Sequence, residues 1–330
     1  MQKDLPEKDP WAREFRTLRV SLTQACNFAC SYCVFPSEKL SKHPKELAFE
    51  DLIRLVQLVV HTAGIQKIRI TGGEPLLHHH FLDIAKAFAQ LPVPSIGLTT
   101  NGTYLTRFAA HFRACRILSV NVSLDSLDPK LFRDLSQFGS LSKTLEGVES
   151  LLKEGIKVKI NCVVMRSKNF HSLLPLLDFA LEKGVECRFL ELMQMGPIDA
   201  KSFAEDFVGL EEILTLVSSQ YSVQKMETKP NATALSFWVE GKTNFKTGSF
   251  GVIANVSKPF CSGCDRLRVT SLGEMYGCLS SLKNFPIHQL LVLEKELAEP
   301  ILKKILGQAL QTKQSVKFLG AKTSMKYLGG

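Results

Sequence analysis

The chain has 330 residues, which suggests about two domains, and its apolar content of 45% excludes an intrinsically disordered protein. Lysine and arginine number 41 against 32 acidic residues, so the formal net charge is +9. That balance suits a polyanionic partner. The basic residues are scattered and form no basic tail, which favours a phosphorylated small molecule over nucleic acid or an anionic membrane.

The cysteine content points to a reducing compartment. The first fifteen residues are rich in acidic side chains and contain two prolines, unlike a signal peptide, and no apolar run approaches membrane-spanning length. Nine cysteines in such a chain are better explained by metal or redox use than by disulfides. We therefore expect a cytoplasmic protein with no membrane partner.

From residue 16 to residue 193 the sequence alternates short β-rich runs with amphipathic helical ones such as 50–63 and 170–183. We predict strands at residues 17–23, 67–71, 95–100, 117–124, 157–164 and 186–192. Such alternation predicts a parallel sheet, and six units fall short of a closed (β/α)8 barrel. The expected fold class is therefore α/β, a partial (β/α)6 TIM-type barrel.

Polar side chains alternate with apolar ones along these strands. The polar set includes Arg19, Lys67, Arg69, Asn121, Ser123, Lys157 and Lys159. The apolar set should face the crossover helices, which leaves the polar set inside the barrel. Because unpaired buried charge is costly, we expect a wet, positively charged cavity. A solvated sheet face is the alternative interpretation.

Three cysteines follow the first predicted strand. Cys26, Cys30 and Cys33 form a C-x3-C-x2-C array, in which three thiolates repel one another unless a cation binds them. A four-iron cluster takes four ligands, so three cysteines would leave one iron open. A structural zinc site completed by His43 is the alternative, but the cysteine spacing and the distant histidine are unusual for zinc. We favour an iron–sulfur cluster.

The run T-G-G-E-P at residues 71–75 follows the second strand. Its two glycines would let a ligand approach the backbone closely, and a tight turn explains them nearly as well. Three consecutive histidines follow, His78 to His80, and consecutive residues share no helix face. We expect them to begin a helix in solvent and to bind no metal.

After Met193 the alternation of strands and helices ends. We predict an irregular loop at 194–208, a helix at 209–219, short strands at 222–227, 234–239 and 249–256, and helices across 285–317. The barrel is thus predicted to span residues 1–220. A smaller α+β domain, residues 221–330, is predicted to cover its open side.

This C-terminal region contains a second cysteine array, Cys261, Cys264 and Cys278, with C-x2-C-x13-C spacing. Zinc with His288 deserves more weight here, because C-x2-C is a common zinc half-site. Arg266 and Arg268 follow in a predicted strand and share one face. Two adjacent guanidinium groups repel each other unless an anion bridges them, and arginine matches phosphate oxygens well. Solvated arginines on an edge strand are the alternative.

Together these runs resemble the GTP 3′,8-cyclase family of radical S-adenosylmethionine enzymes. The resemblance extends from about Arg16 to Gly330 and depends on L-R-V-S-L-T-Q-A-C-N-F-A-C-S-Y-C, I-R-I-T-G-G-E-P-L, F-C-S-G-C-D-R-L-R and the Gly-Gly end. It implies two 4Fe-4S clusters and S-adenosylmethionine as cofactors, with GTP as substrate. The implied reaction converts GTP to (8S)-3′,8-cyclo-7,8-dihydroguanosine 5′-triphosphate through a 5′-deoxyadenosyl radical. That reaction is the first step of molybdenum cofactor biosynthesis.

The resemblance also implies site residues. Cys26, Cys30 and Cys33 would hold the cluster that cleaves S-adenosylmethionine, and Cys261, Cys264 and Cys278 a cluster that holds the guanine. The implied S-adenosylmethionine contacts are Tyr32, Gly73, Ser123 and Met193. The implied GTP contacts are Arg19, Lys67, Arg69, Thr100, Lys159, Arg188, Arg266, Leu267 and Arg268. Arg19, Arg266 and Arg268 would serve catalysis, with Gly329 and Gly330 forming a tail threaded into the active site.

The implied partners are a flavodoxin- or ferredoxin-type reductant, cyclic pyranopterin monophosphate synthase downstream, and a second copy in a homodimer. The chain departs from the family pattern at Ala25, Ala29, His78 and His79, where the family usually has arginine, and matches it poorly over 283–317. Two alternatives remain. One is a radical S-adenosylmethionine peptide-modifying enzyme with an auxiliary cluster. The other is a zinc-dependent nucleic-acid-binding protein, which the lack of clustered surface basic residues disfavours.

Overall fold

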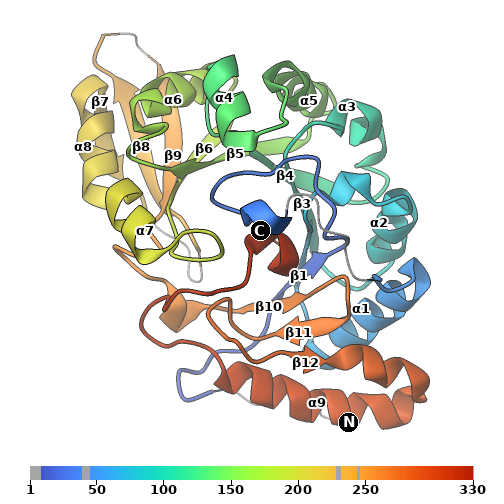
Figure 1. Ribbon diagram of the computed structural model, residues 1–330. Coiled ribbons are helices and arrows are strands. Elements are labelled where there is room, and N and C mark those ends of the chain that lie inside the picture. Colours follow the sequence, from blue (N-terminus) through green and yellow to red (C-terminus); the bar gives the residue numbers. More distant parts are fainter. Residues whose placement is uncertain (1–8, 39–44, 228–231, 244–245, 330) are drawn as a thin grey trace.

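A mixed sheet of 12 strands runs through the part of the chain that the structure describes, residues 9–38, 45–227, 232–243 and 246–329 of a computed structural model (Figure 1). Its order is β12-β11-β10-β1-β2-β3-β4-β5-β6-β9-β8-β7. The six central strands are mutually parallel and follow chain order. They are β1 (Thr17–Ser21), β2 (Lys67–Thr71), β3 (Ser95–Thr100), β4 (Ile117–Ser123), β5 (Lys157–Val164) and β6 (Glu186–Glu191).

Helices cover the outer face of these six strands (Figure 1). They are α1 (Phe49–Ala63), α2 (Phe81–Ala89), α3 (Leu105–Phe108), α4 (Pro129–Ser136), α5 (Leu141–Lys153) and α6 (Leu173–Glu182). The predicted barrel is confirmed, and the strands β2, β3 and β5 have the predicted bounds. The cause is local: Leu18, Val20, Ile68 and Ile70 alternate along their strands and are fully buried against the helices.

The C-terminal strands extend this sheet at both edges. On one side β9 (Thr247–Ile253) pairs in parallel with β6, followed by antiparallel β8 (Leu235–Gly241) and β7 (Tyr221–Lys225). On the other side β10 (Arg266–Val269) pairs in parallel with β1, followed by antiparallel β11 (Glu274–Tyr276) and β12 (Phe285–Pro286). A domain boundary at residue 220 stays a prediction, since the strands that follow it join the same sheet as the barrel.

One of the predicted elements in the C-terminal half is wrong. The loop predicted at 194–208 contains α7 (Ala200–Asp206), because the Asp199 side chain accepts a hydrogen bond from Ser202 N at 2.7 Å and caps the helix. The helices predicted across 285–317 are confirmed over most of that range, as a 3-10 helix at Ile287–Val292 and as α9 (Lys295–Gln311). Residues 312–317 are not helical.

The remaining helices are short or connect the strands. They comprise α8 (Leu210–Gln220), α10 (Met325–Leu328) and 3-10 turns at Pro36–Glu38, Pro75–Leu77, Ala109–His111, Phe170–Ser172, Cys261–Gly263 and Ile287–Val292. Figure 1 places α10 inside the curve of the strands, away from the outer layer of helices. Among the described helices, none has the length and apolarity that crossing a membrane requires.

Candidate functional site

Three arginines lie at one level across three adjacent strands. In the parallel pairings Arg19 of β1 is opposite Arg268 of β10 on one side and Arg69 of β2 on the other. Two residues earlier, Thr17 is flanked in the same way by Arg266 and Lys67. Side chains two apart on a strand share a face, so these cations all point away from the helix-covered side. The register therefore gathers positive charge inside the barrel.

Two of these arginines are buried, and Arg19 between them is half-buried. Arg69 and Arg268 retain only 8% and 6% of their exposed surface. Burial, followed by the charges of Arg268, Arg266 and Arg69, lowers the pKa of Arg19 well below its usual value. Burial and Arg266 lower the pKa of Arg268 to about 10. Within the described residues no carboxylate forms an ion pair with any of these arginines, so the site is prepared to receive an anion.

On the facing strands, a carboxylate of β6 pairs with two of the cations. Glu186 Oε2 lies 2.6 Å from Lys159 Nζ, and its Oε1 lies 2.5 Å from Arg188 Nε. Both cations are thus held by a single acid and keep a net positive charge between them. The ammonium group of Lys67 loses its proton more readily than usual, because burial and the neighbouring Arg69 lower its pKa to about 8.

Gly97 makes room for Arg69. The two residues are opposite each other in the register, and a Cβ at position 97 would lie 2.6 Å from Arg69 Nη1. Arg69 Nη1 donates to Leu98 O at 2.9 Å, which holds the guanidinium across β3. A glycine here therefore serves the cationic site and not a turn.

Glu74, which sequence reasoning passed over, anchors the loop beneath the site. It is fully buried and accepts hydrogen bonds from Leu76 N, Asn101 N and Thr100 Oγ1, the last at 2.7 Å. Burial raises the pKa of Glu74 to about 7. The Thr100 hydroxyl is therefore committed to Glu74, and its contact with GTP stays a prediction. The sequence does offer a sign of this role, since Glu74 directly follows two glycines in the loop after β2.

The first cysteine array forms a half-buried loop after β1. Burial, Cys33 and Asp125 raise the pKa of Cys30 well above its usual value, and burial and Glu74 raise that of Cys26 to about 11. Three thiols that feel one another's charge are the donor set of an iron–sulfur cluster, and a bound cation would relieve their repulsion. In the described part of the chain, no three His, Cys, Asp or Glu side chains lie close enough together to coordinate one metal ion. His43, the alternative zinc ligand, lies outside the described residues.

The two glycines of the T-G-G-E-P run contact the cysteine loop itself. Gly73 N donates to Thr23 O at 2.6 Å, and Glu74 N donates to Ala25 O at 2.8 Å. A Cβ on Gly73 would lie 2.4 Å from Ala25 O, and one on Gly72 would lie 2.8 Å from Thr23 O. The close approach expected for a ligand is therefore made by the chain's own backbone. It joins the loop after β2 to the loop of cysteines.

Of the predicted S-adenosylmethionine contacts, Tyr32 and Ser123 lie on one side of the barrel. Tyr32 Oη donates to Asp125 Oδ2 at 2.7 Å, two residues beyond Ser123 at the end of β4. Burial raises the pKa of Asp125 to about 6. Met193 instead packs with Met195, Tyr276 and Leu328, close to α10. These contacts stay predictions.

The second cysteine array lies next to cationic side chains. Cys261 begins the 3-10 turn after which Cys264 leads into β10, and Cys278 follows β11. Burial opposes ionisation of Cys264, but the charges of Arg266 and Lys313 lower its pKa to about 6. Burial, Cys264 and Cys278 raise the pKa of Cys261. Charge interaction among three thiols again fits a cluster. His288, the alternative zinc ligand, packs over Gly273, and no described group of ligands includes it.

The end of the described chain enters the cationic site. Arg268 Nη1 donates to Leu328 O at 3.4 Å and also to Gly329 O. Gly329 has φ +75°, and a Cβ there would lie 2.6 Å from Thr71 Cγ2. A tail without a side chain therefore fits beside β2 where a larger residue would collide. Gly330 lies outside the described residues.

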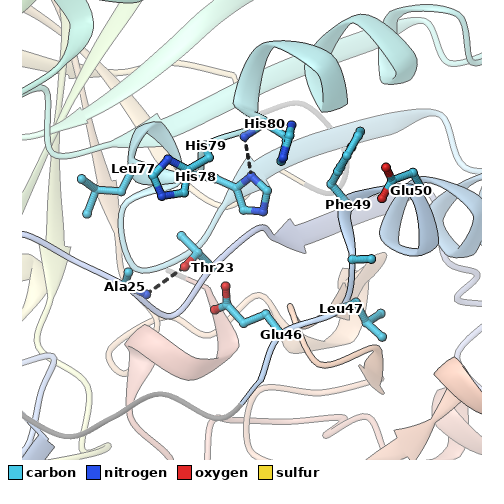
Figure 2. A pocket seen from close by; sticks show the side chains of 11 residues that line it. Thr23, Ala25, Glu46, Leu47, Phe49, Glu50, Leu77, His78, His79 and His80 are labelled. Carbon is cyan, nitrogen blue, oxygen red and sulfur yellow. Dashed lines mark hydrogen bonds between the residues drawn. The ribbon is translucent and has the colours of Figure 1, made fainter.

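A separate hollow of about 690 Å³ lies beside the cysteine loop (Figure 2). It is lined by Thr23, Ala25, Glu46, Leu47, Ala48, Phe49, Glu50, Leu77, His78, His79 and His80. His80 stacks on Phe49 with 4.0 Å between ring centroids, directly before α2 begins. The histidines are therefore at a helix start, as expected, with His79 and His80 exposed and His78 half-buried.

Known families match both halves of the chain. The Radical SAM superfamily matches residues 20–180, and Molybdenum Cofactor Synthesis C matches residues 185–319. These two matches define the class, a radical S-adenosylmethionine protein with a molybdenum cofactor synthesis region at its C-terminal side. An iron–sulfur cluster and S-adenosylmethionine are the cofactors of that class.

Curated relatives narrow the class. The GTP 3′,8-cyclase of Synechocystis sp. is 33% identical over 87% of this chain and 86% of its own length. That of Corynebacterium glutamicum is 36% identical over 86% of this chain and 77% of its own length. The chain belongs to the GTP 3′,8-cyclase family. The resemblance seen in the sequence is confirmed.

A solved structure supports the fold alone. Streptococcus suis SuiB bound to S-adenosylmethionine superposes with a TM-score of 0.61 at 16% identity. The match covers 87% of this chain and 68% of that one. The barrel and its added strands are thus an architecture already seen in a solved structure.

Gly73→Ala should displace the cysteine loop, because the new Cβ would collide with backbone that cannot move freely. We expect the iron retained after anaerobic reconstitution to fall severalfold, measured together with acid-labile sulfide. Gly64→Ala is the control. A Cβ added at Gly64 would have no atom within 4 Å, but the residue has a left-handed φ of +64°. The substitution should therefore lower the stability by about 1–2 kcal/mol, and the variant should keep its iron. Equal iron in both variants would contradict the close contact.

Proposed function

We propose that this chain is a GTP 3′,8-cyclase, which converts GTP to (8S)-3′,8-cyclo-7,8-dihydroguanosine 5′-triphosphate in the first step of molybdenum cofactor biosynthesis. The observation that carries the proposal is the row of Arg268, Arg19 and Arg69 across three strands. Arg69 and Arg268 are buried and Arg19 is half-buried, and among the described residues none of the three pairs with a carboxylate, so a triphosphate would neutralise them. Arginine forks bind phosphate oxygens in pairs, which also orients the nucleotide.

The other proposed GTP contacts extend this row. Arg266 and Lys67 precede it on the same face, and Lys159 and Arg188 are on the facing strands. Leu267 differs, because its side chain is fully buried on the opposite face of β10. Leu267 could therefore meet GTP only through its main chain.

Cys26, Cys30 and Cys33 would hold the first 4Fe-4S cluster, with Tyr32, Gly73, Ser123 and Met193 around S-adenosylmethionine. When bound and reduced by one electron, the cluster and S-adenosylmethionine would supply the radical chemistry that acts on the ribose 3′ carbon of GTP. The barrel residues orient the nucleotide and exclude water. Gly329, at Arg268, would close the site.

Cys261, Cys264 and Cys278 would hold a second 4Fe-4S cluster, whose open iron receives the guanine. Support comes from the charges of Arg266 and Lys313, which lower the pKa of the Cys264 thiol to about 6. The proposal includes a flavodoxin- or ferredoxin-type reductant, cyclic pyranopterin monophosphate synthase as the next enzyme, a homodimer and a cytoplasmic location. It includes no role for nucleic acid.

An anaerobic assay with GTP, S-adenosylmethionine and dithionite tests the reaction directly. Brown protein should form 5′-deoxyadenosine and the cyclised nucleotide together. Colourless protein that contains zinc would contradict the proposal and favour the nucleic-acid-binding alternative. Cleavage of S-adenosylmethionine that does not depend on GTP would favour a peptide-modifying enzyme.

Replacing single cysteines separates the two clusters. Cys26→Ala, Cys30→Ala or Cys33→Ala should abolish S-adenosylmethionine cleavage, because the radical source needs three thiolates. Cys261→Ala should keep the first cluster and lose most GTP turnover. Product and 5′-deoxyadenosine are measured by chromatography. Intact cyclisation in both kinds of variant would make the two-cluster assignment wrong.

Arg266→Ala and Arg268→Ala should each weaken GTP binding by about 1.5–3 kcal/mol, because a charge-assisted hydrogen bond is lost. Calorimetric titration of GTP measures the effect, and iron content should not change. Arg133→Ala removes an exposed arginine on α4 and serves as the control. Native affinity in both β10 variants would exclude this strand as the phosphate clamp.

GTP affinity should also fall as the pH rises through about 8. Unliganded Lys67 loses its proton near that pH, whereas bound triphosphate favours the protonated ammonium, so binding takes up a proton. Between about pH 7 and about pH 9 we expect a loss of up to roughly tenfold, measured calorimetrically. Lys67→Met should abolish this dependence, and Lys157→Met, an exposed residue of β5, should keep it. An unchanged pH profile in Lys67→Met would exclude Lys67 as its source.

A further inference from the structure

Lys313 is a buried cation for which the proposed reaction has no role. It follows α9, retains 8% of its exposed surface and lies over the Phe15 ring, 5.0 Å from its centroid. No described carboxylate forms an ion pair with it. Burying an ammonium group without a counter-ion is costly, so an anion near its head group is expected.

The structure provides that anion at the second cysteine array. Lys313 Nζ donates to Cys264 Sγ at 3.2 Å and to Arg266 O at 2.8 Å. The second bond fixes the ammonium to the first residue of β10, so its distance from the sulfur is set by the sheet. Lys313 is therefore directed at a predicted cluster ligand from a segment far away in the chain.

A second buried cation holds this segment in place. Arg13 Nη1 donates to Cys261 O at 2.8 Å and to Gln314 O at 2.7 Å, which ties residue 314 to the cysteine turn. Arg13 is itself paired with Asp9 at 2.6 Å. The charge of Arg13 is thus paired with Asp9, whereas Lys313 directs its ammonium group at the sulfur with no carboxylate partner among the described residues.

The first cysteine array has different surroundings. Besides burial, the charge of Glu74 raises the pKa of Cys26, and the charges of Cys33 and Asp125 raise that of Cys30. Lys326 of α10 is the cation that acts on Cys26. Around Cys264, burial is opposed chiefly by the charges of Arg266 and Lys313. The two arrays are thus electrostatically distinct.

We propose that Lys313 is a positioning residue for the second cluster, which holds the Cys264 thiolate and raises the reduction potential of the cluster bound there. A hydrogen bond to a ligand sulfur and a nearby positive charge both stabilise the reduced, more negative cluster. The inference depends on the proposed second cluster. It adds a residue and an electrochemical property that the cyclase reaction alone does not require.

The test uses the full chain with Cys26, Cys30 and Cys33 all replaced by alanine, so that only the second cluster can form. In this parent, Lys313→Gln removes the charge but keeps a donor for Arg266 O. Lys313→Arg keeps the charge, and Lys317→Gln removes an exposed lysine four residues further on. Iron, acid-labile sulfide and the midpoint potential from an electron paramagnetic resonance titration are measured for each.

We expect Lys313→Gln to lower the reduction equilibrium constant at least tenfold, which is about 59 mV for one electron. Lys313→Arg and Lys317→Gln should stay close to the parent. Loss of iron in Lys313→Gln but not in Lys313→Arg would also support the proposal, because the thiolate would then need the charge to hold its metal.

Two results would overturn the inference while the proposed function stands. One is an unchanged potential in Lys313→Gln. The other is equal loss of iron in Lys313→Gln and Lys313→Arg, which would mean that the site needs only the packing of a lysine. A parent that holds zinc or no metal would instead remove the second cluster, and with it both this inference and that part of the proposed function.

Discussion

Repulsion among like charges inside the barrel is the constraint on which the remaining structure depends. Arg268, Arg19 and Arg69 stay at one level only because the alternate residues of their strands are buried against the helices. A slip of one residue would move every arginine into the apolar layer, so the hydrophobic face protects the register of the charged one. The carbonyls of Leu98 and Gly329 provide partial compensation within the chain itself.

The two cysteine arrays lie at opposite ends of the barrel strands, and their charged neighbours differ. The first is packed on the T-G-G-E-P backbone and surrounded by the buried acids Glu74 and Asp125. The second leads directly into the strand that carries Arg266 and Arg268. A nucleotide between them would have its phosphates at the cationic row, while the two ends of the barrel differ in charge. The same strand therefore serves both as a phosphate site and as the support of a cysteine ligand.

Much of the barrel could be predicted from the sequence, because period-two alternation in strands such as 67–71 is a local property. The cationic interior followed from the same pattern. The position of β10 beside β1 could not be predicted, since no local signal pairs residue 17 with residue 266. The contact of Gly73 with Ala25 and the burial of Lys313 also depend on distant backbone. The helix α7 was missed although its capping residue Asp199 was visible, because only seven residues follow the cap.

The same long-range pairing governs how this chain folds during synthesis. Both edges of the six-stranded barrel, β1 and β6, find their outer partners only in β10 and β9, which emerge from the ribosome after residue 246. Until then the nascent barrel exposes two unpaired strand edges of the kind that join to other chains. Pairings so distant in the sequence also form slowly. Chaperone protection until these strands have emerged thus has a specific target, the open β1 edge and Arg19.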